Sequence, residues 1–133
     1  TLFKVQPFDA GPDQKLPDGV VSFELFGSLF FGAVGKIEAL ESQIAPGTRA
    51  VVLEMHRLIS MDTSGLDALR QLQRSLKRRD VALVLANVNE QPLSLIRRSG
   101  FEATLGAENI VPSVADAAEL DHDAAASRPV QPA

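Results

Sequence analysis

One short stretch of the chain, Asp62-Thr63-Ser64-Gly65-Leu66, combines a carboxylate, two hydroxyls and a glycine. It follows the apolar run 50–53 and precedes leucines that recur at helical spacing as far as Leu76. This pattern predicts a buried strand, a turn and the first turn of a helix. Because the dipole and the free amides of a helix N-terminus stabilise an added phosphate, Thr63 and Ser64 are candidate phospho-acceptors.

The same stretch is also suited to capping the helix. Asp62, Thr63 and Ser64 each carry a short side-chain oxygen that can accept hydrogen bonds from the amides of the first turn. Ser64, with Asp67 three residues later, resembles a capping box. We expect capping as the minimum role of the stretch, and a phosphorylated hydroxyl is compatible with it.

Catalytic and metal-binding patterns are weak elsewhere in the chain. His56 and His122 lie far apart, with no ligand spacing around either, so we expect no metal site. His56 is near Asp62 and Ser64 in sequence, but the local order lacks the Gly-x-Ser-x-Gly elbow of a hydrolase. We therefore predict that the protein is not an enzyme and has no catalytic residue.

The composition disfavours further classes of ligand. Gly27, Gly32 and Gly35 have neither the Gly-Lys-Ser/Thr ending of a P-loop nor the spacing of a dinucleotide-binding turn. A net charge of −4 argues against nucleic-acid binding, which needs a basic field. The chain has no cysteine, which excludes disulfides and thiolate metal sites and fits a reducing compartment.

The elements that position these groups alternate between strands and helices, which is typical of a sheet with parallel neighbours. Glycines and prolines punctuate the pattern. It predicts a strand at 20–26 that breaks at Gly27, an extended piece at 29–31, a helix at 31–44, a strand at 50–53, a helix carrying Leu66 to Leu76, a strand at 81–86, a helix at 90–99, a brief strand at 110–111 and a helix at 113–120.

Phe30 and Phe31 are the densest aromatic point of the chain. A phenylalanine pair buries a large apolar area, so we expect both to be core residues against which a helix docks. The alternative is an exposed apolar patch that contacts a membrane domain or another partner.

Basic residues gather near predicted helix ends. Five of the 13 fall between Arg70 and Arg79, and Arg97-Arg98 closes the next predicted helix. Cations at helix C-termini offset the dipole, which accounts for this pattern structurally. The alternative is a docking surface for anionic lipid headgroups or an acidic partner. With the phenylalanine pair, that surface would comprise Phe30, Phe31, Arg70, Arg74, Lys77 and Arg78.

Two of these stretches resemble a known family. Asp62-Thr63-Ser64-Gly65-Leu66 after a strand resembles the Asp-Ser-Ser-Gly-Leu signature of the STAS domain, which is named for sulfate transporters and anti-sigma-factor antagonists. Residues 25–33 are similar to the Gly-Pro-Leu-Phe-Phe-Gly segment of STAS domains at the C-terminus of SulP anion transporters, with Ser28 in place of the proline. Free-standing antagonists tend to carry Gly-x-Leu-Asp there. The resemblance runs from about Gly19 to Leu120.

The resemblance implies an α/β fold with a STAS-like mixed sheet, parallel central strands, an antiparallel N-terminal edge and about four flanking helices. It further implies a non-catalytic regulatory or interaction domain of a sulfate or bicarbonate transporter, on the cytoplasmic side of the membrane. The implied partners are the membrane domain of the same polypeptide and a cytosolic regulatory protein, with dimerisation through the parent transporter.

Two alternative functions stay open at this point. One is a free-standing anti-sigma-factor antagonist that is controlled by phosphorylation of residues 62–65. The other is a nucleotide-binding or nucleotide-hydrolysing domain, since STAS domains are associated with nucleotide binding. We expect no cofactor, and the amides around 63–66 are where a weakly bound nucleotide would lie.

The chain as a whole fits one domain. We expect residues 1–18 to form a linker or an N-terminal edge strand, 19–120 the STAS domain, and 121–133 a disordered tail. No apolar stretch reaches the length of about 18 residues that a membrane-spanning helix needs. The chain begins with Thr1 and shows no secretory signal, so we expect it to be a piece of a longer protein.

Overall fold

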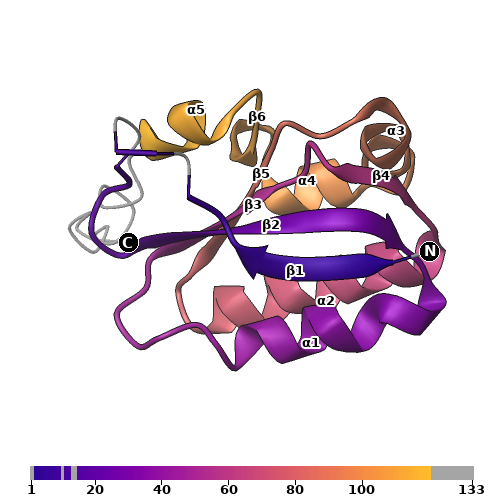
Figure 1. The fold of residues 1–133 in the computed structure, drawn as a ribbon, viewed down its shortest axis with the longest axis horizontal. Coiled ribbons are helices and arrows are strands. Elements are labelled where there is room, and N and C mark those ends of the chain that lie inside the picture. The colour runs from indigo at the N-terminus through magenta and orange to yellow at the C-terminus, as the bar shows by residue number, and fades with distance from the viewer. Residues whose placement is uncertain (1, 10, 13–14, 121–133) are drawn as a thin grey trace, which may run out of the picture.

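A mixed sheet of six strands runs through the middle of the molecule, with helices on both sides (Figure 1). The computed structural model describes residues 2–9, 11–12 and 15–120. The strands are β1 (Phe3–Pro7), β2 (Val20–Leu29), β3 (Ala50–Glu54), β4 (Leu58–Met61), β5 (Ala82–Ala86) and β6 (Ile110–Val111). The helices are α1 (Val34–Glu41), α2 (Thr63–Arg78), α3 (Glu90–Arg98), α4 (Phe101–Leu105) and α5 (Val114–Ala118), with 3-10 turns η1 (Phe31–Ala33) and η2 (Ala107–Asn109).

The strand order is β1-β2-β3-β5-β6, and β4 also pairs with β2. The β1–β2 pair is antiparallel, and all the other pairs in the described part of the chain are parallel. This confirms the predicted mixed sheet with parallel central strands and an antiparallel N-terminal edge. The described residues contain five α-helices rather than about four. The unpredicted helix is α4, which begins directly after Gly100, where a φ of +84° ends α3 and redirects the chain.

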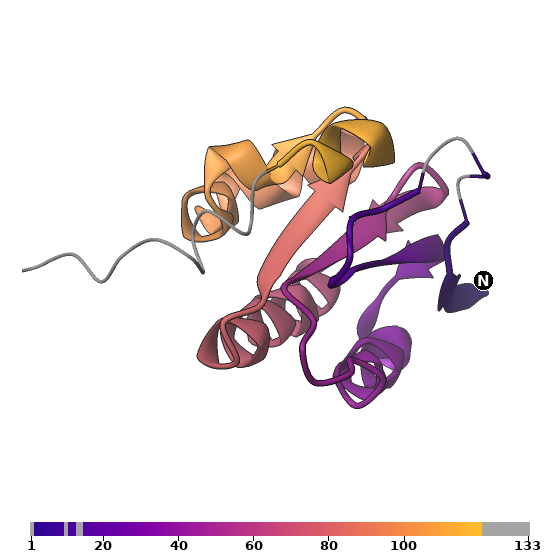
Figure 2. The same cartoon turned by 90° about the vertical axis from the view of Figure 1, so that its left-hand side faces the viewer.

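Two apolar clusters hold the sheet between its covering helices (Figure 2). The larger cluster lies under α1 and α2, and it buries the four leucines whose spacing predicted α2: Leu66, Leu69, Leu72 and Leu76. The smaller one lies on the other face of the sheet, where Val114 and Ala117 of α5 cover Val52 and Val84. Strands that are covered on both faces become continuous apolar runs, as the fully buried β3 shows.

The predicted break at Gly27 is wrong, because β2 continues through it to Leu29. Gly27 has a φ of +100°, and a Cβ there would overlap the carbonyl oxygen of Leu2. The glycine therefore admits the neighbouring chain at a kink inside the strand and does not end it.

Strand β4 was not predicted, because its four residues were interpreted as part of a turn. It pairs with the end of β2 through an irregular register, in which Gly27 opposes Leu58 and Ser28 opposes Ser60. Ile59 is thus left without a partner and stays exposed. The element depends on this tertiary pairing and not on a local pattern.

The boundaries of β3 and β5 differ from the predicted ones by one residue each, and the extended piece expected at 29–31 is divided between the end of β2 and η1. The helix expected over 31–44 begins as η1, and α1 ends at Glu41. The last helix ends at Ala118, and Ser113 caps it by accepting a hydrogen bond from the amide of Asp116, as expected. None of the helices in the described ranges combines the length and apolar character needed to cross a membrane. The predicted disordered tail at 121–133, with His122, lies outside the described residues.

Candidate functional site

Asp62 is the residue that caps α2. Its backbone is extended, and its Oδ1 accepts a hydrogen bond from the amide of Gly65 at 2.9 Å. Its carbonyl oxygen accepts from the amide of Leu66 at 3.0 Å. The predicted capping box of Ser64 and Asp67 is wrong, because Ser64 already lies inside the first helical turn. Of the three candidate capping residues, only Asp62 precedes the helix, and its carboxylate caps it.

Close packing against the end of β2 requires glycine at position 65. A Cβ at this position would overlap the carbonyl oxygen of Leu29 and would lie 3.0 Å from Cγ of Met61. The amide of Asp62 also donates to the carbonyl oxygen of Leu29 at 3.3 Å. The first turn of α2 is therefore held against the ends of β2 and β4, at a distance that only glycine allows.

The two candidate phospho-acceptors differ in exposure. Thr63 is exposed and Ser64 is half-buried, while Gly65 and Leu66 are buried. Neither hydroxyl bonds to another described residue, whereas the carboxylate of Asp62 is engaged with Gly65. Thr63 is thus the hydroxyl that an incoming group can reach, at the positive end of the α2 dipole.

Phe30 and Phe31 are exposed, with 44% and 75% of their surface accessible, so the prediction that they belong to the core is wrong. Leu29 takes the core position at the end of β2 and is fully buried. The chain then turns into η1, which buries none of its residues. The alternative interpretation, an exposed apolar patch, is the one that the structure supports.

A comparison with protein families then identifies the chain, since the model of the STAS domain matches residues 12–117. The chain belongs to the STAS domain family. This confirms the resemblance seen in the two stretches 25–33 and 62–66.

The segments that this chain matches are small parts of related transporters. The chain is 28% identical to Sulfate transporter 1.2 of Arabidopsis thaliana over 120 residues, which cover 81% of this chain and 18% of the transporter. It is 30% identical to Sulfate anion transporter 1 of Mus musculus over 127 residues, which cover 90% of this chain and 18% of the transporter. The chain thus spans less than a fifth of the length of the curated relatives it matches.

Solved structures share the fold. A sulfate transporter family protein from Wolinella succinogenes has a TM-score of 0.74 at 28% identity, with 82% of this chain and 89% of that one covered. A SulP transporter STAS domain from Vibrio cholerae has a TM-score of 0.67 at 21% identity, with 78% and 81% covered. A putative anti-sigma factor antagonist from Thermotoga maritima has 0.68 at 16% identity, with 79% and 89% covered. The last two likenesses concern the fold alone.

The basic residues between Arg70 and Arg79 differ in their contacts. Arg70 donates to the carbonyl oxygen of Ser99 at 2.8 Å and lies 5.6 Å from the ring centre of Phe101. Arg79 donates to the carbonyl oxygens of Glu41 and Ile44 beyond the end of α1. These two arginines therefore bind the C-terminal ends of neighbouring helices, which supports the structural interpretation for them.

The predicted docking surface is not continuous. Arg74, Lys77 and Arg78 are exposed toward the C-terminal end of α2. The phenylalanine pair lies at the other end of this helix, because Leu29 packs against Gly65. At about 1.5 Å per residue, some 20 Å separate the two along the helix. The domain thus has an apolar end and a basic end.

Asn89 and Gln91 hold the strand before the signature stretch, and sequence reasoning missed both. Gln91 accepts from the amide of Met61 at 2.8 Å and donates to its carbonyl oxygen at 3.0 Å. Asn89 donates to the carbonyl oxygens of His56 and Leu58. Side-chain amides thus replace a neighbouring strand along β4. Only the density of amides at 87–91 could have indicated this role.

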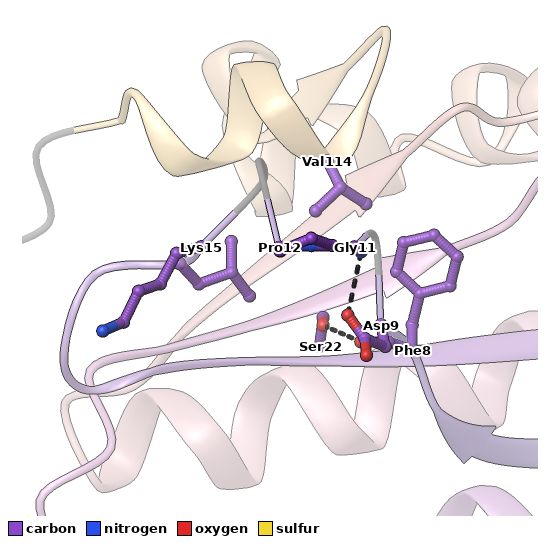
Figure 3. Close-up of a pocket in the computed structure, with 8 residues that line it drawn as sticks. Phe8, Asp9, Gly11, Pro12, Lys15, Ser22 and Val114 are labelled. Atoms are coloured by element: carbon purple, nitrogen blue, oxygen red, sulfur yellow. Dashed lines mark hydrogen bonds between the residues drawn. The ribbon is translucent and has the colours of Figure 1, made fainter.

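A hollow of about 420 Å³ lies away from the signature stretch, between the described residues of the segment that follows β1 (8–9, 11–12 and 15–16) and α5 (Figure 3). Phe8, Leu16 and Val114 line its apolar part. Its polar groups bond to near neighbours: Ser22 donates to the carbonyl oxygen of Phe8, and the carboxylate of Asp9 accepts from the amide of Gly11. Lys15 points away from it in the close-up. We assign the hollow to packing, not to a ligand.

Proposed function

We propose that this STAS domain is a non-catalytic regulatory and interaction domain of a SulP-type transporter of inorganic anions, with sulfate or bicarbonate as cargo. The observation that carries the proposal is the alignment with the mouse sulfate anion transporter, which spans 90% of this chain and 18% of the transporter. The domain would then be a small cytoplasmic part of a much longer membrane protein. Its first partner would be the membrane domain of the same polypeptide.

The exposed groups of the domain support a role in contacts. Phe30 and Phe31 offer an apolar surface directly after β2, which suits burial against another protein domain. Thr63 offers a hydroxyl that a cytosolic regulatory protein can read or a kinase can modify. These groups lie at the same end of α2, because Leu29 packs against Gly65. A modification at Thr63 would therefore change the field beside the apolar contact.

Other features support the absence of catalysis. His56 is exposed, and the carboxylate of Asp62 is occupied by the amide of Gly65. In this proposal the domain needs no cofactor. Because Asp62 already engages the amides of Gly65 and Leu66, a weakly bound nucleotide would have to contact those of Thr63 and Ser64.

Anion uptake by the parent protein tests the proposal. Removal of the segment that contains this domain should lower the uptake rate per transporter in the membrane. The double variant Phe30→Ser/Phe31→Ser should lower it as well, with Ile59→Ser as a matched control at an exposed apolar residue outside the pair. Unchanged uptake and unchanged membrane abundance after deletion would refute the regulatory role.

A second candidate function rests on the exposure of Thr63 at the first position of α2. A free-standing antagonist would present this hydroxyl to a kinase and would bind its partner only in one phosphorylation state. The length of the native open reading frame separates the two candidates. Several upstream apolar segments of about 20 residues each would select the transporter, and a chain of this size with its own start codon would select the antagonist.

A further inference from the structure

The outer edge of β1 carries backbone groups that point away from the sheet. The amide of Phe8 donates to the carbonyl oxygen of Ser22, and the ladder continues from there in a single antiparallel register. Because hydrogen-bonded and non-bonded pairs alternate in such a ladder, the backbone groups of Phe3, Val5 and Pro7 face outward. The free edge of the sheet is therefore formed by these three residues.

Two of the three outer positions are already blocked in part. Lys36 of α1 donates its Nζ to the carbonyl oxygen of Phe3 at 2.7 Å, and Pro7 has no N–H to offer. The outward N–H and C=O of Val5 bond to no residue among those that the structure describes. One donor and one acceptor thus stand side by side at the centre of the edge, which is the pattern that an added strand recognises.

A groove runs along this edge with α1 as its floor. In both views α1 lies beneath β1 (Figures 1 and 2). A hollow of about 290 Å³ extends past Val5 toward Ala39, and a second one of about 310 Å³ extends past Leu2 and Phe30. Lys36 lines both, so the two hollows adjoin at its side chain, where Nζ reaches the carbonyl oxygen of Phe3.

The lining of the groove has a defined chemistry. Its charged residues are Lys4 and Lys36, and the lining of the two hollows includes no carboxylate. Its apolar end carries Leu2 and Phe30, which are 60% and 44% exposed. Ala39 has a small side chain, which leaves room above the floor for side chains of an incoming strand. An extended chain with acidic side chains and one apolar side chain would complement all of these groups.

We propose that the groove between β1 and α1 binds an extended acidic segment of a partner protein, which pairs with β1 as an additional strand. At about 3.3 Å per residue, the edge from Leu2 to Gln6 accommodates about five residues. The acidic side chains lie near Lys4 and Lys36, and an apolar side chain lies between Leu2 and Phe30. The inference concerns the 133-residue chain itself and holds whether or not it comes from a transporter.

A second copy of the chain suits the groove less well. Its own β1, with the sequence Phe3-Lys4-Val5-Gln6-Pro7, carries a lysine and no acidic residue. Pairing two such edges would bring two cationic strands together. The proline at the end of each strand would also shorten the shared ladder. The charge of the groove thus favours a different, acidic polypeptide.

Titration of the ¹⁵N-labelled chain with the synthetic peptide acetyl-Leu-Glu-Val-Asp-Val-amide tests the proposal. Saturable changes in amide chemical shift are expected over Leu2–Gln6, Phe30–Ala33 and Lys36–Gln43, and they should weaken with added salt. The matched peptide acetyl-Leu-Lys-Val-Lys-Val-amide should bind at least about tenfold more weakly, which corresponds to about 1.4 kcal/mol. Equal binding of the two peptides, or shifts centred elsewhere, would overturn the proposal.

Variants of the chain separate backbone pairing from charge. Val5→Pro removes the outward N–H without touching a bond to β2, whereas Val5→Ala shortens the side chain and keeps the N–H. The proline variant should lose at least about tenfold in affinity, and the alanine variant should stay close to the parent chain. Lys4→Gln/Lys36→Gln should weaken binding and its salt dependence, with Lys77→Gln/Arg78→Gln as the control. Equal affinities for the two Val5 variants, or self-association that Val5→Pro abolishes, would refute an acidic partner strand.

Discussion

At the scale of single residues, the signature stretch separates into positions with different physical tasks. Asp62 caps the helix, Gly65 allows the close approach to Leu29, and Leu66 belongs to the core. Thr63 contributes to none of these contacts and is exposed. A residue without a structural task at an exposed helix start is free to carry a regulatory one.

Thr63→Glu should leave the free energy of unfolding within about 1 kcal/mol of the parent chain, because exposed substitutions seldom cost more. The added carboxylate is near Asp62, which disfavours it, and at the N-terminus of α2, which favours it. A urea melt measures the change in stability. The same variant should alter partner binding or transport, and a loss of several kcal/mol would instead show a structural role for the threonine.

Gly65→Ala should destabilise the fold by about 1–3 kcal/mol or more, since the new Cβ would overlap the carbonyl oxygen of Leu29. Gly35→Ala is the matched control, because Gly35 lies in α1 with nothing within 4 Å of its added Cβ. That substitution should raise stability by about 0.5–1 kcal/mol. Equal effects of the two in thermal melts would contradict the close packing of α2 on β2.

At the scale of elements, the sequence predicted what depends on local patterns. The leucine period of α2 and the apolar runs of β3 and β5 fixed their location, since burial on one face or both leaves a readable period. Strand β4 left no such period, because it is stabilised by its pairing with β2 and by the side chain of Gln91. Its existence depends on residues 30 positions away.

Gln91→Ala should cost about 1–3 kcal/mol, because it leaves the amide and carbonyl of the buried Met61 without partners. Hydrogen exchange at the Met61 amide should accelerate more than exchange in β3. Gln71→Ala, on the exposed face of α2, is the control and should change stability by no more than about 0.5 kcal/mol. Unaltered protection of Met61 in Gln91→Ala would mean that β2 and Asn89 hold β4 without Gln91.

At the scale of the whole molecule, the sequence indicated which residues could form contact surfaces but not where those residues lie relative to one another. The alternative interpretation of the phenylalanines and basic residues grouped them in one docking surface, yet α2 places an apolar group at one end and a cationic group at the other. Arg70 and Arg79 donate hydrogen bonds to backbone carbonyls beyond the ends of neighbouring helices, and no spacing in the sequence specifies these contacts. Phe30 and Phe31 were expected in the core, but Leu29 is the buried residue there. The chain turns into η1 directly after β2, and η1 buries none of its residues.

The second face of the sheet supplies the last prediction, because its cover comes from a short C-terminal helix. Val114 and Ala117 of α5 close a cluster around Val52 and Val84, and all four are buried. Truncation after Pro112 should therefore lower the free energy of unfolding by at least about 2 kcal/mol, the scale of exposing one buried valine. It should also increase binding of an apolar dye to the uncovered face.

Truncation after Leu120 is the matched control. It removes only the segment predicted from composition to be disordered and leaves α5 in place. Its urea midpoint should equal that of the full chain. If both truncations lowered the midpoint equally, the final segment would contribute to stability, and the prediction of a disordered tail would be wrong.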